Sequence, residues 1–339
     1  MKAVVLVGGE GTRLRPLTET VPKPLLPLVD RPILDHVLDH LVAHGVDEVV
    51  MSSPYLEETF HPFIRGRSGT PAITWVTERE PLGTGGAIVS ALHLLDDEPF
   101  FALNSDILTD LDLTEMLATH RAAGVAATIA LHHVEDARAF GLVETDDAGR
   151  ITAFREKPPD PVPGEVNAGT YVLEPSALEA WRPETYIWIE GEVFPAMIKD
   201  GAAVVGFSSN AYWLDLGTPA SYLRGHFDLL GGRVGGKAYE APWVFHDVFI
   251  DPTARIGRSV AIGPGASVGA SATIDESVLL AGVHVRARAR ISGSILGPRA
   301  AVGEGARLVG CVLGEGARVP GGAALQDRRV PAGALADPS

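Results

Sequence analysis

The order of hydrophobic and polar positions divides the chain into two parts. In the first two thirds, continuous apolar runs such as residues 3–7 alternate with segments whose apolar residues recur at helical spacing. In segment 31–45 these residues share one helical face, with Pro32 near its start and Gly45 just past its end. Further strands are expected at 47–52, 72–78 and 100–106, and a further helix at about 87–95.

This alternation predicts an α/β domain, in which a mostly parallel, doubly wound sheet has helices on both faces. Ligands of such sheets bind outside the carboxyl ends of the strands. Residues 8–13 and 104–106 both follow expected strands. We therefore expect them to contribute to one site.

The last third has a different period. From about residue 252 to 319 an aliphatic residue recurs every six positions, and a small residue often stands two positions before it. A six-residue period with glycine and alanine at the corners is typical of a parallel β-helix. The first series ends at Leu280, and the spacing shortens to five at Val285 before it resumes. We expect a catalytic domain at 1–231, a glycine-rich linker at 232–242, a β-helix at 243–325 and a tail at 326–339.

Composition narrows the class of ligand. The chain has 339 residues and a formal net charge of −15, which argues against a nucleic-acid partner but allows a local cationic site for a small phosphorylated molecule. The only cysteine, Cys311, cannot form an internal disulfide. The apolar run at the N-terminus is shorter than a secretory signal, and no stretch approaches a membrane span. These features indicate a cytoplasmic protein without a membrane partner.

Positive charge is concentrated in "GGEGTRLRPLTETVPKPL", residues 8–25, which we call the basic loop. Its glycines would let backbone N–H groups approach a phosphate. It lacks the Gly-Lys-Ser/Thr of a Walker loop, and Leu14 stands where the dinucleotide fingerprint has its third glycine. Arg13 offers a planar fork for phosphate oxygens, and Lys23 lies between two prolines. Arg15 could equally form a surface ion pair.

The basic loop resembles the signature of the sugar-1-phosphate nucleotidyltransferases. The resemblance continues through "EREPLGTGGAI", "NSD", "RAFGLVETDDAGRITAFREKP", "NAGTYVLEP", "IEGEVFP" and "YWLDLGTP". With the hexapeptide tail, the chain is most similar to the mannose-1-phosphate guanylyltransferases. It differs at Ser105, where many relatives have glycine. The resemblance implies a Rossmann-like doubly wound mixed sheet followed by a left-handed parallel β-helix. We expect the β-helix to be an assembly element or an effector platform, and a homo-oligomer built through it or through its contact with the catalytic domain.

The resemblance also implies the reaction and its residues. A sugar 1-phosphate would attack the α-phosphorus of GTP in line and release pyrophosphate, assisted by Mg²⁺. The resemblance assigns the catalytic roles to Arg13, Lys23, Asp106 and Asp215, the last two also holding the metal ion. It assigns the nucleotide to Leu6, Gly8, Gly9, Gly11, Thr12, Glu78, Pro81, Gly83 and Thr84. It assigns the sugar phosphate to Gly141, Glu156, Lys157, Asn167 and Gly169.

Hydrogen-bond chemistry favours guanine as the base. Guanine presents two adjacent donors, N1–H and N2–H₂, which one carboxylate can accept together, and Glu78 offers such a carboxylate. Thymidylyl and uridylyl relatives tend to have glutamine at this place. Two alternatives stay open: Glu80 fills this role, or Glu78 is a solvated residue at the end of a strand.

Three rival functions stay open as well. The first is thymidylyl, uridylyl or adenylyl transfer to glucose 1-phosphate. The second is a bifunctional enzyme whose β-helix is an acyltransferase, with His246 or His284 as its base. The third is a non-catalytic subunit that senses nucleotide sugars. His36, His40 and His44 recur every four residues on the first expected helix, where we expect a solvated face and not a metal site.

Overall fold

The computed structural model describes residues 1–54, 57–236 and 238–337. The chain forms two compact units, each made of two segments. The first unit comprises Met1–Gly9 and Val37–Trp213, and the second comprises Glu10–His36 and Leu214–Ser339. The basic loop therefore belongs, from Glu10 onward, to the same unit as the C-terminal third of the chain.

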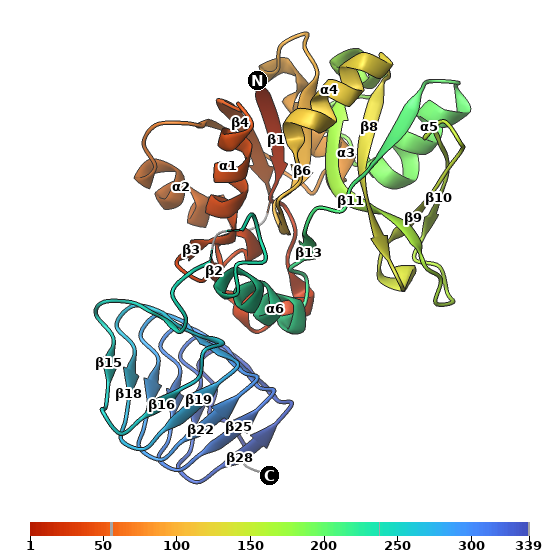
Figure 1. Cartoon of the computed structure of the whole chain (residues 1–339). Coiled ribbons are helices and arrows are strands. Elements are labelled where there is room, and N and C mark those ends of the chain that lie inside the picture. The colour runs from red at the N-terminus through yellow and green to blue at the C-terminus, as the bar shows by residue number, and fades with distance from the viewer. Residues whose placement is uncertain (55–56, 237, 338–339) are drawn as a thin grey trace. The chain divides into compact units, whose positions relative to one another are not determined.

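A mixed sheet organises the first unit (Figure 1), in the order β10-β9-β11-β6-β1-β4-β5, with β8 beside β11 and β12 beside β8. Strands β1, β4, β5 and β6 are parallel, whereas β11 runs antiparallel to β6. The expected mixed α/β sheet is thus confirmed. The strands are β1 (Lys2–Leu6), β4 (Glu48–Ser53), β5 (Ala72–Thr77), β6 (Phe100–Asn104), β7 (Ile107–Thr109), β8 (Ala127–Val134), β9 (Gly141–Thr145), β10 (Ile151–Glu156), β11 (Gly164–Leu173) and β12 (Val204–Ser208).

The register of the central strands brings polar residues together at the carboxyl ends of these strands. Leu6, the last residue of β1, pairs with Ser52 on β4 and with Asn104 on β6. Strands β1 and β6 are almost wholly buried, which explains their continuous apolar sequences. The carboxyl ends of these parallel strands thus meet where the sequence places its glycine loop and its "NSD" motif.

Helices pack around this sheet and connect its strands. They are α1 (Ile33–Ala43), α2 (Glu57–Gly66), α3 (Gly83–Ala91), α4 (Leu113–Ala123) and α5 (Phe194–Lys199), with a π-helical turn at Ile189–Val193. Helix α3 begins four residues before the expected start at 87. The amides of Gly85 and Gly86 both donate to Ile187 O, so tertiary contacts hold this glycine-rich turn in place despite its low helix propensity.

The second unit begins with short turns in place of a helix. After the glycines the chain makes 3₁₀ turns at Thr12–Leu14, Leu17–Glu19 and Lys23–Leu25, then a small hairpin of β2 (Pro27–Leu28) and β3 (Arg31–Pro32). The proline-rich sequence explains this, since proline removes backbone donors and disfavours the α conformation before it. Strand β13 (Trp213–Asp215) ends in this unit, and helix α6 (Pro219–Leu230) follows with a capping box at Thr218.

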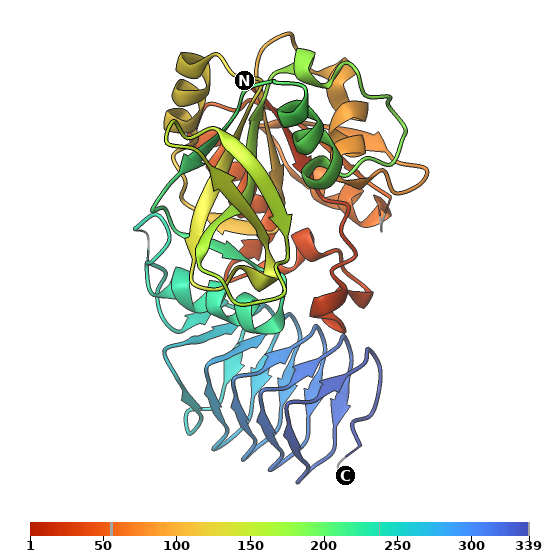
Figure 2. The same ribbon diagram turned by 90° about the vertical axis from the view of Figure 1, so that its right-hand side faces the viewer.

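The C-terminal part of the second unit is a parallel β-helix with three sheets, as the six-residue period predicts (Figure 2). One sheet contains β14 (Trp243–Val244), β17 (Val260–Ile262), β20 (Ser277–Leu279), β23 (Ile295–Leu296), β26 (Val312–Leu313) and β29 (Arg329–Val330). Another contains β15 (Phe249–Ile250), β18 (Ser267–Val268), β21 (His284–Val285), β24 (Ala301–Val302) and β27 (Arg318–Val319). The last contains β16 (Arg255–Ile256), β19 (Thr273–Asp275), β22 (Arg290–Ser292), β25 (Arg307–Val309) and β28 (Ala324–Gln326).

The register of the coils corrects one expected core position. Phe249 pairs with Ser267, so the first coil takes 18 residues. Ile262 pairs with Leu279, and Leu279 pairs with Leu296, so the coils that follow take 17. Leu279 belongs to the core of the prism, whereas Leu280 does not. The expectation that Leu280 continues the series was therefore wrong by one residue. The short step falls between Ile274 and Leu279, before the position the sequence suggested.

A polar ladder occupies the small-residue positions of one sheet. Ser277, Ser294 and Cys311 are fully buried and lie 17 residues apart on successive coils. The Ser294 amide donates to Ser277 Oγ at 3.1 Å, and the Cys311 amide donates to Ser294 Oγ at 3.0 Å. Each hydroxyl therefore satisfies a backbone donor of the coil that follows.

Candidate active site

The ends of β1 and β6 are joined by a serine. Ser105 is buried, and both its amide and its hydroxyl donate to Leu6 O, at 3.2 and 2.7 Å. A glycine at this position could form only the amide contact. Asp106 follows directly and is half-buried. The serine that distinguishes this chain thus fixes the strand end from which Asp106 and the first glycines extend.

Glu78 is buried at the end of β5, with 8% of its surface exposed. Its Oε1 accepts from Ser52 Oγ at 2.6 Å, and its Oε2 accepts from the Leu82 amide at 3.1 Å. The interpretation of Glu78 as a solvated strand-end residue is therefore wrong, whereas Glu80 is exposed. The two bonds fix the plane of the Glu78 carboxylate, and each oxygen keeps a second lone pair for a ligand.

A chain of hydrogen bonds connects two sets of expected ligand-binding residues. Thr84 Oγ1 donates to Glu190 Oε2 at 3.0 Å, and the hydroxyl of Tyr171 donates to Glu190 Oε1 at 3.0 Å. Asn167 Nδ2 donates to the Tyr171 oxygen at 2.9 Å, and Asn167 Oδ1 accepts from the Gly169 amide at 2.9 Å. The expected nucleotide-binding Thr84 and sugar-binding Asn167 are thus positioned by one carboxylate, that of Glu190.

Glu190 and Tyr171 are residues that sequence reasoning did not select. Both lie inside motifs of the resemblance, "IEGEVFP" and "NAGTYVLEP", which was the available signal. Gly169 has a positive φ of 72°, and a Cβ there would lie 2.6 Å from Asn104 Nδ2. Glycine is thus required for the close approach of β11 to the end of β6.

The "AFG" and "REKP" motifs meet on one hairpin. Gly141 on β9 pairs with Glu156 on β10, and the Lys157 amide donates to Phe140 O at 3.1 Å. Lys157 is exposed and adopts a positive φ of 43°. The side chain of Glu156 lies outside the residues that the structure describes. Backbone pairing therefore brings together three expected sugar-phosphate residues.

In the second unit, three charged side chains of the expected site converge. Asp215 Oδ2 lies 3.5 Å from Arg13 Nη2, and Asp215 Oδ1 lies 3.6 Å from Lys23 Nζ. A Cβ on Gly217 would come within 2.4 Å of Arg13 Nη2 and 2.7 Å of Asp215 Oδ1. Gly217, in the "DLGTP" stretch, is thus what allows the carboxylate and the guanidinium to approach.

Burial makes this arrangement electrostatically necessary. The Lys23 side chain is 7% exposed, that of Asp215 is 20% exposed, and that of Arg13 is 59% exposed. An ammonium group held this far from water needs a nearby counter-charge. Gly11, at a φ of 61°, packs against Lys23 Cβ, and Thr18 Oγ1 donates to Gly11 O at 2.8 Å. The basic loop is thus folded back on its own lysine.

The remaining expected residues lie in exposed or partly exposed backbone. Gly8, Gly9 and Thr12 are exposed on the basic loop. Pro81 is also exposed, and Gly83 follows it at the start of α3 with a positive φ of 69°. Within each unit, the structure thus gathers these residues near the strand end or turn that the sequence predicts.

Carboxylates for a cation are few in the described part of the chain. It contains no group of three or more His, Cys, Asp or Glu side chains that could hold a metal ion. Asp215 Oδ1 is nevertheless buried, and it accepts no hydrogen bond from any described residue. A carboxylate oxygen of this kind suits a cation that takes most of its ligands from phosphate and water.

The histidines of α1 are packed, so the expected solvated face was wrong. His36 Nε2 lies 2.9 Å from Leu28 O, and His44 Nδ1 lies 2.9 Å from Thr114 Oγ1. Burial, reinforced by His44, lowers the pKa of His40 to about 4. A low pKa keeps the His40 ring neutral at physiological pH.

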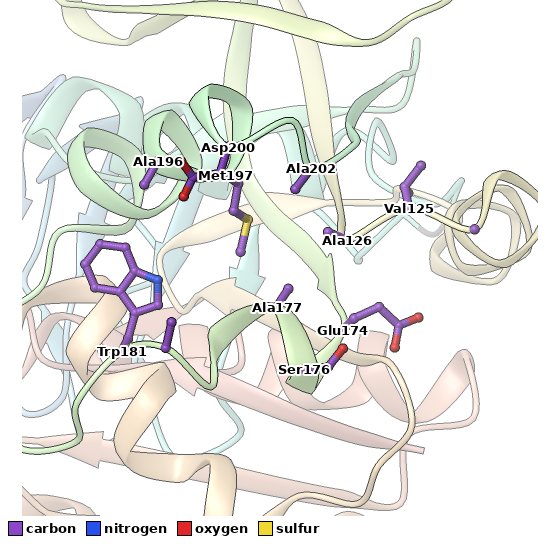
Figure 3. A pocket seen from close by; sticks show the side chains of 12 residues that line it. Val125, Ala126, Glu174, Ser176, Ala177, Trp181, Ala196, Met197, Asp200 and Ala202 are labelled. Carbon is purple, nitrogen blue, oxygen red and sulfur yellow. The ribbon is translucent and has the colours of Figure 1, made fainter.

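A separate hollow in the first unit lies at the opposite end of the central strands. It has a volume of about 600 Å³, and Trp181, Met197 and Glu174 are among the side chains that line it (Figure 3). Glu174 follows the end of β11, whose last residue pairs with the first residue of β6. Asn104 is at the other end of β6. This hollow is therefore distinct from the residues selected by sequence.

A nucleotidyltransferase is expected to have the features found here: a mixed α/β sheet, a basic loop after the first strand, and a carboxylate, that of Asp215, which faces two cations. The family model described as "Nucleotidyl transferase" matches residues 2–231, and that described as "GMPPB C-terminal domain" matches residues 240–332. The chain therefore belongs to the nucleotidyl transferase family. Within the described residues, none of the helices is long and apolar enough to span a membrane.

Its curated relatives carry a more specific name. The chain is 38% identical over 291 residues to the mannose-1-phosphate guanylyltransferase of Mycobacterium tuberculosis, covering 84% of this chain and 81% of that protein. It is 38% identical to the probable mannose-1-phosphate guanylyltransferase 2 of Arabidopsis thaliana, covering 91% and 89%. It is 36% identical to the mannose-1-phosphate guanylyltransferase catalytic subunit beta of Danio rerio, again covering 91% and 89%.

A solved structure with the same fold is HddC from Yersinia pseudotuberculosis. It has a TM-score of 0.59 and 26% identity, and the match covers 66% of this chain and 97% of that protein. A second structure of HddC, complexed with GMP-PN, matches equally well. The likeness supports the fold described for this chain over the part that the match covers.

Proposed function

We propose that this protein is a mannose-1-phosphate guanylyltransferase, which converts GTP and mannose 1-phosphate to GDP-mannose and pyrophosphate. The observation that carries the proposal is the placement of Arg13 and Lys23 on either side of Asp215. Two cations and one carboxylate are the groups needed to receive a triphosphate with its metal ion. The names of relatives that match most of the chain support the choice of GTP and mannose 1-phosphate over the alternatives.

The chemistry requires alignment and charge neutralisation. A phosphate oxygen of mannose 1-phosphate forms a bond to the α-phosphorus of GTP, while the bond from that phosphorus to the pyrophosphate oxygen breaks. The nucleophile is ionised near neutral pH, so no residue needs to remove a proton. Lys23 would neutralise the α-phosphate, and Arg13 would bind the departing pyrophosphate. The backbone of Gly8, Gly9, Gly11 and Thr12 would cradle the triphosphate.

Asp106 and Asp215 would hold a divalent metal ion, for which we propose Mg²⁺. The buried Oδ1 of Asp215, which lacks a hydrogen bond from any described residue, fits that role. When bound, the ion would supply charge neutralisation at the phosphate oxygens. The short bond from Ser105 to Leu6 O would hold the main chain before Asp106 in place for it.

Glu78 would select guanine. Its carboxylate is already fixed by Ser52 and Leu82, so its orientation is set before the nucleotide binds. The free lone pairs would accept N1–H and N2–H₂ of the base. Leu6, Pro81, Gly83 and Thr84 would line the nucleotide pocket.

The sugar phosphate would bind at the network around Glu190 and at the β9–β10 hairpin. Asn167, fixed by Tyr171 and Gly169, and Glu156 would bind ring hydroxyls. Lys157 would bind the phosphate, and Gly141 would leave room for the sugar. These roles follow the resemblance, and the hydrogen-bond network supports them by joining Asn167 to Thr84 through Glu190.

We also propose a cytoplasmic location and a homo-oligomer assembled through the β-helix. Cys311 is free and buried in the β-helix core, which suits a reducing compartment. The oligomer is tested by measuring the mass in solution of the chain ending at Gly231. An unchanged subunit number would exclude assembly through the β-helix.

The test of the function is a pyrophosphate-release assay that crosses GTP, ATP, UTP and dTTP with mannose 1-phosphate and glucose 1-phosphate. It is run with and without Mg²⁺. We expect release that depends on Mg²⁺ and is greatest for GTP with mannose 1-phosphate. Greatest release with another pair would keep the reaction class and overturn the specificity. No release with any pair would overturn the function.

A further inference from the structure

An arginine from the last coil of the β-helix contacts the basic loop. Arg329 lies on β29, and its Nη1 donates to the main-chain oxygens of Arg13 and Arg15, both at 3.0 Å. Three residues further on, the Ala332 amide donates to Glu19 Oε2 at 3.3 Å. Figure 2 shows the red turns of the loop beside the dark-blue end of the coil stack. All of these residues belong to the second unit.

One of the two carbonyl groups, that of Arg13, lies within the 3₁₀ turn at Thr12–Leu14, and the other, that of Arg15, lies at the C-cap of this turn. The turn is closed by bonds from the Leu14 amide to Gly11 O and from the Arg15 amide to Thr12 O. Pro16, the next residue, brings no N–H group. A positive group at the C-terminal end of a helical turn offsets the partial negative charge of such carbonyls.

The acceptors show that this contact is not an ordinary surface ion pair. Arg329 directs its guanidinium to two neutral carbonyl oxygens, although the chain as a whole is acidic. Ordering a long arginine side chain costs conformational entropy. Because the acceptors here are neutral, this cost must be offset by well-placed hydrogen bonds and not by the attraction of opposite charges. One donor shared by two carbonyls fixes the orientation of the peptide group between Arg13 and Leu14 and of that between Arg15 and Pro16.

That backbone carries Arg13. The Arg13 guanidinium is held at its far end by Asp215, at 3.5 Å, and its main chain is held by Arg329. We propose that Arg329 is a positioning residue for Arg13. Through it, the last coil of the β-helix sets the geometry of the group that would receive the departing pyrophosphate. The effect on catalysis rests on the proposed function, whereas the contact between Arg329 and the basic loop does not.

The test compares three variants of the full chain: Arg329→Ala, Arg329→Lys and, as a matched control, Arg307→Ala. Arg307 is exposed on β25, which belongs to another sheet of the same β-helix. Kinetics are measured in both directions, with GTP plus mannose 1-phosphate and with GDP-mannose plus pyrophosphate. Hydrogen–deuterium exchange of the amides of residues 12–19 is measured in the protein without substrates.

For Arg329→Ala we expect kcat to fall on the order of tenfold and KM for pyrophosphate to rise several-fold, because Arg13 is misplaced. KM for mannose 1-phosphate should stay within about twofold, since Arg13 does not bind the sugar. Exchange at residues 12–19 should be about tenfold faster. Arg329→Lys should recover part of both effects because an ammonium group has three donors for the two carbonyls. Arg307→Ala should match the unaltered protein.

Two results would overturn the proposal. One is unchanged exchange at residues 12–19 in Arg329→Ala. The other is faster exchange throughout the β-helix, with no recovery in Arg329→Lys, which would show a general structural role. If the unaltered protein gives no product, the proposed function fails. The exchange comparison then still decides whether Arg329 holds the loop.

Discussion

Asp215 shows how one carboxylate makes a buried cation possible. Lys23 loses most of its hydration, and the carboxylate at 3.6 Å replaces part of that stabilisation. The same carboxylate faces Arg13, so two cations are held before any phosphate arrives. Preorganised charge of this kind acts without reorganisation during the reaction. The function of each residue here therefore depends on the spacing that its neighbours allow.

Gly217 controls that spacing. In Gly217→Ala the new methyl group would meet the Arg13 guanidinium and the Asp215 carboxylate, so one of them must move. We expect kcat/KM for GTP to fall on the order of a hundredfold, as misplacement of a catalytic group by about 1 Å does. Steady-state kinetics measure the effect. Gly66→Ala, where a Cβ has open space, serves as the control and should keep full activity.

The proposed role of Glu78 in the choice of base can be tested by replacing its carboxylate with an amide. A glutamine can satisfy both neighbours, since its oxygen can accept from the Leu82 amide and its nitrogen can donate to Ser52 Oγ. Glu78→Gln should therefore fold normally but lose one charge-assisted bond to guanine. We expect kcat/KM for GTP to fall about tenfold to a hundredfold relative to UTP. Glu80→Gln, at an exposed site, should retain the preference, and the reverse pattern would assign the base to Glu80.

At the scale of elements, the β-helix is stabilised by a core that repeats every coil. Its aliphatic residues fill a narrow prism, and each strand pairs with the corresponding strand of every adjacent coil. The Ser277–Ser294–Cys311 ladder places hydroxyl and thiol groups where the other sheets mostly have alanine. The two serine hydroxyl groups accept buried backbone N–H groups, whereas the Cys311 thiol donates to Val309 O. Stability therefore depends on satisfying each buried donor of the ladder.

Ser294→Ala removes one acceptor from the ladder. The Cys311 amide would be left buried without its partner, which costs about 1–3 kcal/mol of unfolding free energy. Ser294→Cys introduces the side chain that the next coil already has, and we expect it to cost less. Urea denaturation monitored by circular dichroism measures both. Equal stability of Ser294→Ala and the unaltered protein would contradict the role given to the ladder.

At the scale of the whole molecule, neutral histidines are buried in both units. His40 lies in the first unit, and burial with the nearby His44 lowers its pKa to about 4. His226 lies in the second, where burial, with a smaller effect of His36, lowers its pKa to about 3. His226 Nδ1 accepts from the Val29 amide at 3.1 Å, so a neutral ring is also required by its bonding. At a pH between the lowered pKa and the ordinary value of 6.5, each ring is therefore neutral in the folded protein and protonated in the unfolded chain.

Stability should therefore fall as the solution is acidified below pH 6.5. Between that value and the lowered pKa, the unfolded chain binds the extra proton, so each histidine removes up to about 1.4 kcal/mol per pH unit. Above pH 6.5 the effect vanishes. His226→Asn keeps an acceptor for the Val29 amide but cannot titrate, so its loss of unfolding free energy from pH 7 to pH 5 should be smaller.

The measurement is urea denaturation at both pH values. His246→Asn is the matched control because His246 is exposed, and it should show the same pH dependence as the unaltered protein. An identical pH dependence in His226→Asn would exclude His226 as a source of acid sensitivity.

Local patterns predicted the strands of the sheet and the coils of the β-helix, since continuous apolar runs and a six-residue period are both visible among neighbouring residues. They also placed Arg13, Lys23 and Asp215 in candidate roles by resemblance. The choice of Leu279 over Leu280 could not be predicted, because both are apolar and only pairing with Leu296 decides between them. The burial of His36 and the bonds of Glu190 depend on residues distant in sequence, which no local pattern contains.

The division of the second unit between the two ends of the chain sets an order for its completion during synthesis. Residues 10–36 leave the ribosome early, yet the residues with which they pack, from Leu214 onward, are translated much later. Arg329 lies on β29 of the β-helix, so it too is translated long after the loop that it contacts. The loop that would receive GTP therefore lacks part of its own catalytic support until the β-helix has been translated.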